Sequence, residues 1–451
     1  MNKYCQGIGN TILISMISWT TIAHAQDQPS NRGDREAYAL YLAYAKDIKS
    51  SYPSAQVAEA QFNIALMHYK GRGVEKNLKL AFTWYLQSAE LGNAQAQRNL
   101  ARMYANGEAT QIDFTKAAYW YGFAAEQGDT FSQGELASLF ADGKGVEKND
   151  HKAFMWSEKA AKNNDVVSQY KVAMCYETGR GVAVDYSQAM KWYLLAAQKN
   201  DANAQFKLGY LYEHGLGVEV NLTLAGQWYQ KSADQGNLAA INNLAAIRSV
   251  GNGSVSDQTA AFDGYRLLAE RGDVHAQYNI AVMYSNGAGA SRNVEQALRW
   301  YQEAAQTGHV LAQYNLGVLF RDGGDVPRDE KKAVFWFEKA ALQGHASAQN
   351  NLAALYYLGS SAIQNFSQAA YWFRKAADQG DKSAQQNLSS IYQSGHGVPK
   401  DLIAAYQWLR IAQNNGYQIG GKRLLYLERS LNSDQKGKAE IFIREWMAKK
   451  E

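Results

Sequence analysis

Residues 310–345 have the sequence VLAQYNLGVLFRDGGDVPRDEKKAVFWFEKAALQGH, and this pattern returns every 36 residues from Ala58 to Tyr417. Equivalent positions in the ten copies form columns, and nine copies carry tryptophan in one of them: Trp84, Trp120, Trp156, Trp192, Trp228, Trp300, Trp336, Trp372 and Trp408. A period between about 20 and 50 residues is typical of a solenoid, in which each unit buries its apolar face against its neighbours. The sequence therefore predicts an all-α fold, an α-solenoid superhelix of about ten helix-turn-helix repeats. We expect the tryptophan column to lie in its core, because a tryptophan buries roughly 150–250 Å².

Each copy is predicted to form two antiparallel helices. In the seventh copy, residues 274–309, apolar residues recur at spacings of three and four over 275–285, which indicates one buried helical face. The second helix is expected to begin after Asn293, in a column that holds only Asn or Asp, because these short side chains cap first-turn amides. It is expected to end at Gly308, in a column of glycine and asparagine, the residues that tolerate a left-handed cap.

The repeat also resembles that of a known family. In the eighth copy the resemblance is carried by Ala312 to Phe320, Gly323, Ala333, Trp336, Phe337 and Lys339 to Gly344. These residues are similar to the Sel-one-like repeat, a relative of the tetratricopeptide repeat. The resemblance covers residues 58–417 and implies a bacterial exported protein whose stacked helix pairs serve as an interaction scaffold.

The first 25 residues have the features of a signal peptide. Lys3 gives a weakly basic start, residues 11–22 are mostly apolar, and Ala23-His24-Ala25 is the small-x-small pattern that precedes cleavage. We expect the mature chain to begin at Gln26 and to be periplasmic or secreted in a bacterium. The apolar segment is too short to span a bilayer, so no membrane insertion is expected.

The predicted domain organisation has four parts. Residues 1–25 form the signal peptide, 26–57 an N-terminal capping helix, 58–417 the ten repeats, and 418–451 the C-terminal capping helices. The last helix is expected to have its N-cap at Asn432 or Ser433.

Charge and cysteine content disfavour several classes of function. The formal net charge is only +4, which gives no electrostatic case for binding nucleic acid or an anionic membrane. Cys5 belongs to the presumed signal peptide, and Cys175 occupies a column of Met, Leu and Ile, so it is expected to be a buried hydrophobe. Some members of the resembled family that are linked to β-lactams carry a cysteine pair in nearly every repeat. This chain lacks such pairs, so a β-lactam or cell-wall hydrolase is the disfavoured alternative.

The sequence offers no catalytic constellation, and we expect no enzyme, no cofactor and no metal site. Among the histidines only His309 and His345 share a column. Packed helices lie about 8–10 Å apart, whereas zinc ligands each sit about 2 Å from one ion. These two residues are therefore predicted to lie at the surface where helices begin.

The best candidate for a binding site is the column that precedes the central Leu or Ile of each first helix. Seven copies hold asparagine there, and the other three hold Glu135, Lys171 and Lys207; the seven are Asn63, Asn99, Asn243, Asn279, Asn315, Asn351 and Asn387. Asparagine in mid-helix costs roughly 0.5 kcal/mol relative to alanine, so its repetition needs a compensating bond. The column resembles the asparagine ladders of tetratricopeptide superhelices, and by that resemblance it would hold the main chain of an extended peptide along the concave face.

Two alternatives compete with a peptide ladder. The asparagines could instead bond to a neighbouring repeat and stabilise the stacking. The adjoining glutamine column favours a structural role more strongly, because nearly identical copies carry no information about a partner: Gln61, Gln97, Gln133, Gln169, Gln205, Gln277, Gln313, Gln349 and Gln385.

The sixth copy, residues 238–273, departs from the pattern, with Ile241 in the glutamine column and Gly264 in the tryptophan column. Loss of the tryptophan is expected to loosen this layer. Simple drift, a hinge and a site where something else packs are the three interpretations.

The leading functional hypothesis is a monomeric, non-enzymatic scaffold of the bacterial cell envelope that binds a partner protein or extended peptide. The second is a secreted, virulence-associated factor that binds a host protein. Whether the protein leaves the cell would separate the two.

Overall fold

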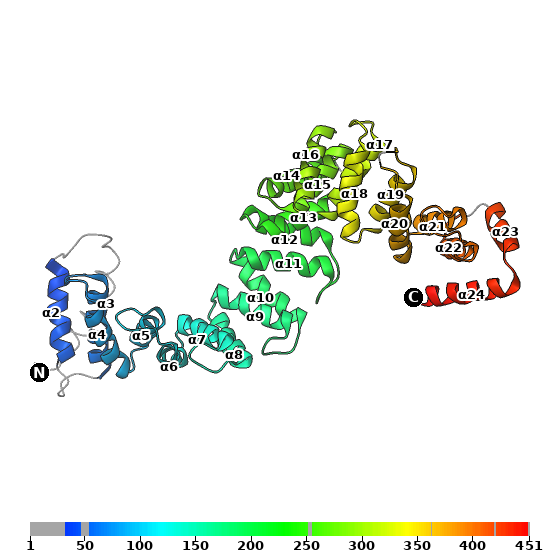
Figure 1. The fold of residues 1–451 in the computed structure, drawn as a ribbon. Helices are drawn as coiled ribbons and strands as arrows, with labels where there is room; N and C mark the ends of the chain where they lie inside the picture. The colour runs from blue at the N-terminus through cyan, green and yellow to red at the C-terminus, as the bar shows by residue number, and fades with distance from the viewer. Residues whose placement is uncertain (1–31, 47–53, 251–254, 362, 419–420, 450–451) are drawn as a thin grey trace, which may run out of the picture. The chain divides into compact units, whose positions relative to one another are not determined.

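The computed structural model describes residues 32–46, 54–250, 255–361, 363–418 and 421–449, which form helices without any strand (Figure 1). This confirms the predicted all-α solenoid of repeated helix pairs. The presumed signal peptide and its cleavage site lie outside the described residues. Among the residues that the structure describes, no helix is both long and apolar enough to cross a bilayer.

The chain divides into two compact units, Met1–Gln235 and Gly236–Glu451, here called the N-terminal and C-terminal units. The N-terminal unit begins with a capping helix, α2, and continues with five helix pairs: α2 (Arg32–Lys46), α3 (Ser54–Lys70), α4 (Leu78–Glu90), α5 (Ala94–Asn106), α6 (Phe114–Glu126), α7 (Thr130–Asp142), α8 (Asp150–Lys162), α9 (Val166–Thr178), α10 (Tyr186–Gln198), α11 (Ala202–His214) and α12 (Leu222–Asp234).

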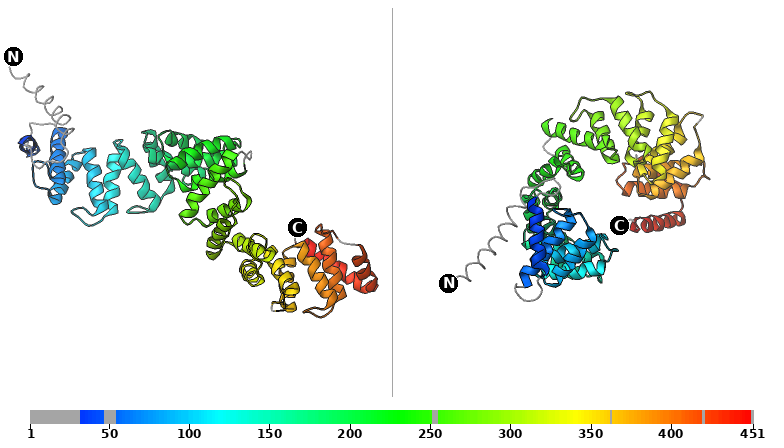
Figure 2. Two further views of the ribbon diagram at one scale, coloured as in Figure 1. Left: turned by 90° about the horizontal axis from the view of Figure 1, so that it is seen from above. Right: turned by 90° about the vertical axis from the view of Figure 1, so that its left-hand side faces the viewer.

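The C-terminal unit holds the other five pairs and two further helices: α13 (Leu238–Val250), α14 (Val255–Glu270), α15 (Val274–Asn286), α16 (Val294–Gln306), α17 (Val310–Asp322), α18 (Glu330–Leu342), α19 (Ala346–Leu358), α20 (Phe366–Asp378), α21 (Lys382–Ser394), α22 (Leu402–Asn414), α23 (Gly421–Ser430) and α24 (Ser433–Ala448). Within each unit, successive helices of the array pack against one another, as two further views show (Figure 2).

The predicted caps set the helix boundaries. Asn293 Oδ1 accepts a hydrogen bond from Gln296 N at 3.0 Å, at the start of α16. The glycine or asparagine column after each second helix has positive φ in all ten copies, including 101° at Gly308 and 67° at Asn164. At the C-terminus Asn432 is the N-cap of α24 and forms a capping box with Gln435. The cap predictions are therefore confirmed, and Asn432, not Ser433, fills the last position.

One loop glycine fixes how neighbouring copies approach. Gly145 has φ +70°, and a Cβ placed on it would lie 2.1 Å from the carbonyl carbon of Phe114, in the preceding copy. No side chain fits there, so this turn after α7 is locked against the start of α6.

The tryptophan column is fully buried only in the C-terminal unit. Trp300, Trp336 and Trp372 are 6–9% exposed and Trp408 is 1% exposed. The five tryptophans of the N-terminal unit are only half-buried: Trp84, Trp120, Trp156, Trp192 and Trp228. The expectation of a uniform tryptophan core is thus wrong for the N-terminal unit, where the alanine and tyrosine columns fill the centre instead.

The sixth copy still forms a helix pair, α13 with α14. A Cβ on Gly264 would lie 3.3 Å from Ala245 Cβ and 3.6 Å from Ile241 Cγ2, so α13 and α14 are closely packed where the tryptophan is missing. The looser packing that we expected for this copy is not found at Gly264. The division between the units falls directly before this copy, and its role as a hinge stays a prediction.

Candidate functional site

The asparagine column lies on the first helix of each pair, as the sequence predicts. Asn63 and Asn99 are buried, whereas the asparagines of the C-terminal unit are half-buried and so reach solvent in part: Asn243, Asn279, Asn315, Asn351 and Asn387. The accessible part of the column is therefore the unbroken run in the C-terminal unit.

Several of these amides are engaged inside the chain. Asn63 Nδ2 donates to Glu59 O at 3.0 Å, within α3. Asn315 Nδ2 donates to Tyr301 Oη at 3.3 Å. Asn387 Nδ2 donates to Asn350 Oδ1 at 3.2 Å. Asn243 Oδ1 accepts from Asn242 Nδ2 at 3.4 Å. These bonds support the structural interpretation at part of the column.

Asn279 and Asn351 differ from the other members. Both are half-buried, and neither side chain forms a hydrogen bond with any residue that the structure describes. An amide offers two donors and two acceptor lone pairs, so these two side chains are the members of the column free to bind a partner.

One charged member of the column, Lys207, belongs to a different network. Lys207 Nζ lies 2.7 Å from Glu177 Oε1, and Glu177 also accepts a hydrogen bond from the Tyr193 hydroxyl. Burial, reinforced by Glu177, raises the pKa of Tyr193 well above its usual value of 10, so its hydroxyl stays protonated and donates. Sequence analysis missed this link between columns, which only the packing of consecutive copies reveals.

The glutamine column forms an internal ladder of side-chain hydrogen bonds in six of the ten copies. Gln313 Nε2 donates to Ala305 O of the preceding copy at 3.0 Å, and Gln313 Oε1 accepts from Gln343 Nε2, on the second helix of its own copy, at 2.8 Å. The same acceptor bond forms wherever the residue 30 positions later is an amide, at Gln127, Asn163, Gln235, Gln343, Gln379 and Asn415. Where that residue is Leu91, Lys199 or Thr307, the facing glutamine oxygen has no partner. The glutamines are therefore structural.

His309 and His345 are N-caps of first helices. His309 Nδ1 accepts from Ala312 N at 3.2 Å, and His345 Nδ1 accepts from Ala348 N at 3.1 Å. Burial lowers the pKa of both imidazoles below the usual 6.5, and His275 lowers that of His309 further. Their place at helix starts is confirmed, although both are half-buried and not fully at the surface.

Other candidate chemistry is sparse. No group of three His, Cys, Asp or Glu side chains within the described ranges is arranged to hold a metal ion. Cys175 is a half-buried free thiol, and burial raises its pKa, which disfavours the reactive thiolate.

Comparison with known proteins agrees with this architecture. The model of the Sel1 repeat matches residues 58–93, 94–129, 130–165, 166–201, 202–237, 274–309, 310–345, 346–381 and 382–417, and omits only the divergent sixth copy from the array. No match was found among curated proteins.

Two solved structures illustrate the similarity. One is c5321, a protective antigen present in uropathogenic Escherichia coli strains that displays an SLR fold, with 30% identity, 92% coverage of both chains and a TM-score of 0.72. The other is a Sel1 repeat protein from Oxalobacter formigenes, with 33% identity, 48% coverage of this chain, 90% of that chain and a TM-score of 0.41. Proteins built from these repeats are generally non-enzymatic scaffolds for protein interactions. On the repeat matches and the likeness to c5321, the chain belongs to the Sel1 repeat family.

Proposed function

We propose that this protein is a non-enzymatic scaffold of the bacterial cell envelope that binds an extended segment of a partner protein along the first helices of its C-terminal unit. The observation that supports it most directly is the pair of half-buried asparagine side chains, Asn279 and Asn351, which have no hydrogen-bond partner among the described residues. An extended peptide presents unpaired amide and carbonyl groups to such side chains.

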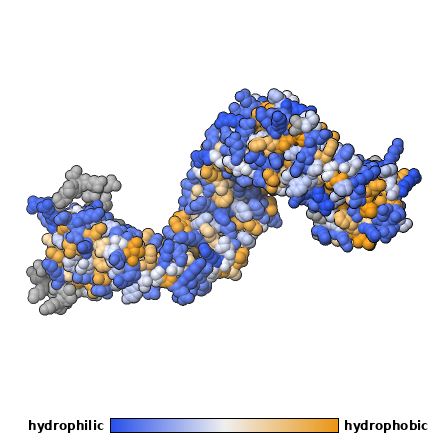
Figure 3. All heavy atoms as spheres, in the orientation of Figure 1, coloured by the Kyte–Doolittle hydropathy of each residue, from blue (hydrophilic) through white to orange (hydrophobic). Residues whose placement is uncertain are grey.

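On the face of the molecule that Figure 3 shows, hydrophobic residues are interspersed with hydrophilic ones, without one dominant apolar region that would suit a large apolar ligand. Tyr278 and Tyr314 precede Asn279 and Asn315 and are partly buried against the core of the C-terminal unit. They offer apolar edges beside the polar ladder, a combination typical of peptide-binding surfaces.

The test compares two pairs of substitutions in the full chain. Asn279→Ala with Asn351→Ala removes the two free amides, and Asn63→Ala with Asn99→Ala removes the two buried ones. Partners are captured from envelope and culture fractions, with helicity and melting recorded for each variant. We expect the first variant to lose a partner that the second retains, with unchanged melting. A partner retained by the first variant, or a clear drop in its melting temperature, would reject this site.

Export is a separate part of the proposal. It rests on the sequence of residues 1–25. Mass measurement of the protein recovered from the envelope should give a chain that begins at Gln26. A chain that keeps residues 1–25 in the cytoplasmic fraction would contradict export.

A secreted factor that binds a host protein is the second candidate. It is favoured by the likeness to c5321, described as a protective antigen of uropathogenic strains. Recovery of the mature chain from culture medium, with binding of the partner there, would favour this candidate over an envelope scaffold.

A further inference from the structure

Three side chains fill the junction between the fourth and fifth copies. The Tyr193 hydroxyl donates to Glu177, and Lys207 Nζ lies 2.7 Å from the same carboxylate. Tyr193 is completely buried. An aromatic ring, a carboxylate and a lysine thus form one closed unit, the Tyr–Glu–Lys triad.

One copy earlier, two of the three members are truncated. The residues 36 positions before the triad are Ser157, Ala141 and Lys171. The lysine is retained, while the aromatic ring and the carboxylate are both missing. Among the ten copies, the tyrosine column holds an aromatic or leucine residue everywhere except at Ser157.

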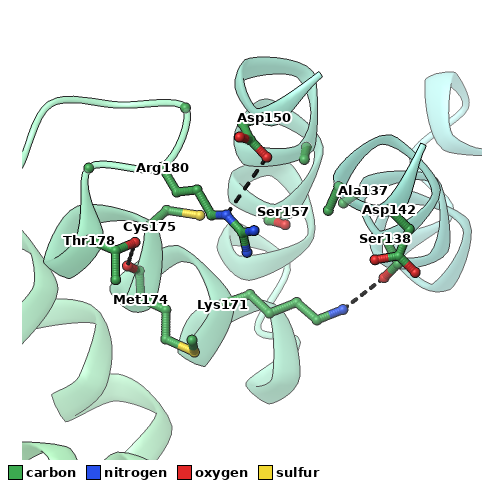
Figure 4. A pocket seen from close by; sticks show the side chains of 14 residues that line it. Ala137, Ser138, Asp142, Asp150, Ser157, Lys171, Met174, Cys175, Thr178 and Arg180 are labelled. Atoms are coloured by element: carbon green, nitrogen blue, oxygen red, sulfur yellow. Dashed lines mark hydrogen bonds and ion pairs between the residues drawn. The ribbon is translucent and has the colours of Figure 1, made fainter. Parts of the chain in front are cut away.

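The missing groups leave a cavity between α7, α8 and α9. It has a volume of about 480 Å³, and Ser157, Ala141 and Lys171 all line it. Figure 4 shows Ser157 between the side chains that border this space, with Lys171 extended along one side toward α7. Binding pockets for small molecules typically measure roughly 300–1,000 Å³, so this volume accommodates a ring with a short substituent.

Lys171 forms no ion pair with a described carboxylate, although its charge, after that of Lys144, helps to lower the pKa of Asp142. Its Nζ donates to Ser138 Oγ at 2.8 Å, and no carboxylate of the described residues lies within ion-pair distance of it. The two acids of the lining are already paired, Asp142 with Lys144 at 2.9 Å and Asp150 with Arg180 at 3.8 Å. A partly enclosed ammonium with unused donors favours an anionic group.

We propose that this cavity binds an aryl carboxylate, with its ring in the space that the Tyr193 ring occupies one copy later and its carboxylate on Lys171 Nζ. The ligand then supplies the two groups that the third copy lacks. The wall is suited to the ring, because Ala137, Ala153 and Met174 present apolar atoms. This inference does not depend on the proposed peptide site, which lies in the other unit.

The same chemistry has two possible sources. One is a free small aromatic acid, and the other is the C-terminal aromatic residue of a partner chain. Phenylacetate and a short peptide ending in phenylalanine represent these sources. Phenylacetamide and the same peptide with an amidated C-terminus are neutral controls of nearly identical shape.

The first experiment is titration of the full chain with the four probes by NMR and calorimetry. We expect saturable binding of one equivalent of an acid probe and at least about tenfold weaker binding of its amide, because the charge-assisted bond to Lys171 is lost. A preference for the peptide assigns the ligand to a partner's C-terminus, and a preference for phenylacetate assigns it to a small molecule. Failure of both acids to bind, or equal binding of acids and amides, would overturn the proposal.

The second experiment rebuilds the triad. Ser157→Tyr combined with Ala141→Glu restores the residues of the fourth copy, so the variant should fold at least as stably as the parent and lose binding. Lys171→Asn introduces the residue type that seven other copies hold and should weaken acid binding to the level of the amide. Unchanged acid binding in either folded variant would place the ligand elsewhere and overturn the assignment.

A third measurement locates the ligand. Cys175 lines the cavity, and Cys5→Ser makes it the only thiol of the chain. Bound phenylacetate should slow its alkylation several-fold at alkaline pH in the parent but not in the rebuilt variant. Equal protection in both would contradict binding in this cavity.

Discussion

The two units use the same columns to build different cores. In the C-terminal unit one continuous cluster of buried residues runs from Ala245 to Ile443. In the N-terminal unit the buried residues fall into separate clusters, among them one from Phe62 to Leu139 and another from Ala173 to Leu211. The interruption lies at the third and fourth copies, where Ser157 replaces the aromatic residue.

The tryptophan column shows the same contrast. In the N-terminal unit its rings are partly exposed, and lysines lie over two of them: Lys159 Nζ is 4.0 Å from the Trp156 ring centre, and Lys231 Nζ is 4.1 Å from that of Trp228. In the C-terminal unit Trp408 packs against Phe442 and Trp446 of α24, with ring centres 6.3 and 5.9 Å apart. A repeated residue therefore has no fixed burial, because its neighbours decide how much water it loses.

The largest predicted effect follows from this contrast. Trp372→Ala should destabilise its surroundings by about 3–5 kcal/mol, as expected for a buried tryptophan, and Trp192→Ala by about half as much because Trp192 is already partly solvated. Hydrogen exchange of α19–α21 and of α9–α11 measures each effect locally. Equal costs at the two sites would mean that the difference in burial has no energetic consequence.

A second pair of substitutions compares an equivalent contact between a helix glycine and an aromatic ring, which occurs once within each unit. A Cβ on Gly209 would lie 2.6 Å from the Tyr229 ring, and one on Gly317 would lie 2.5 Å from the Phe337 ring. Alanine at either position should cost about 1–3 kcal/mol through overpacking. Gly122→Ala is the control: its Cβ meets nothing within 4 Å, so it should stabilise α6 by about 0.5–1 kcal/mol. Thermal unfolding checks all three. A neutral Gly317→Ala beside a costly Gly209→Ala would show that the C-terminal core adapts more easily.

The glutamine ladder gives a smaller effect. Leu91 is 44% exposed and lies 30 positions after Gln61 in the same copy, where Gln61 Oε1 has no hydrogen-bond partner among the described residues. Leu91→Gln should add the missing bond and stabilise the packing of α3 with α4 by about 0.5–1.5 kcal/mol. The reverse change, Gln343→Leu, removes the 2.8 Å bond to Gln313 Oε1 and should destabilise the C-terminal unit by a similar amount or more. Urea unfolding followed by circular dichroism measures both; no gain from Leu91→Gln would mean that solvent already satisfies Gln61.

Features carried by a single column were predictable from the sequence, and features that need two facing columns were not. The caps at Asn293 and Gly308 depend on local geometry that recurs in each copy, so the pattern alone identifies them. The near-identity of the glutamine column predicts its structural role, but not its pairing with the residue 30 positions later. The cavity depends on Ser157 and Ala141 being small together. Both departures are visible in the sequence, but only packing shows that their columns meet. The sequence placed the asparagine column on the first helices correctly. Only the structure shows that Asn315 is hydrogen-bonded whereas Asn351 has no hydrogen-bond partner among the described residues.

The smallest predicted effect is a pH dependence of local stability at two helix starts of the C-terminal unit. The C-terminal unit uses His309 and His345 as N-caps where the N-terminal unit uses Asn or Asp, and burial lowers the pKa of both imidazoles below 6.5. The unfolded chain then binds more protons than the folded one, so the stability contributed by these caps is present above pH 6.5 and is lost as the pH falls through 6.5 toward the lower folded values. Protonation also removes the Nδ1 acceptor and places a positive charge at a helix N-terminus, where the helix dipole disfavours it. On acidification through this range, the amides of α17 and α19 should therefore lose protection, that is, exchange faster relative to their intrinsic rates at each pH. His309→Asp with His345→Asp should remove this relative acceleration while leaving α7 and α9 unaffected. Acceleration that persists in this double variant would assign the pH response to other groups.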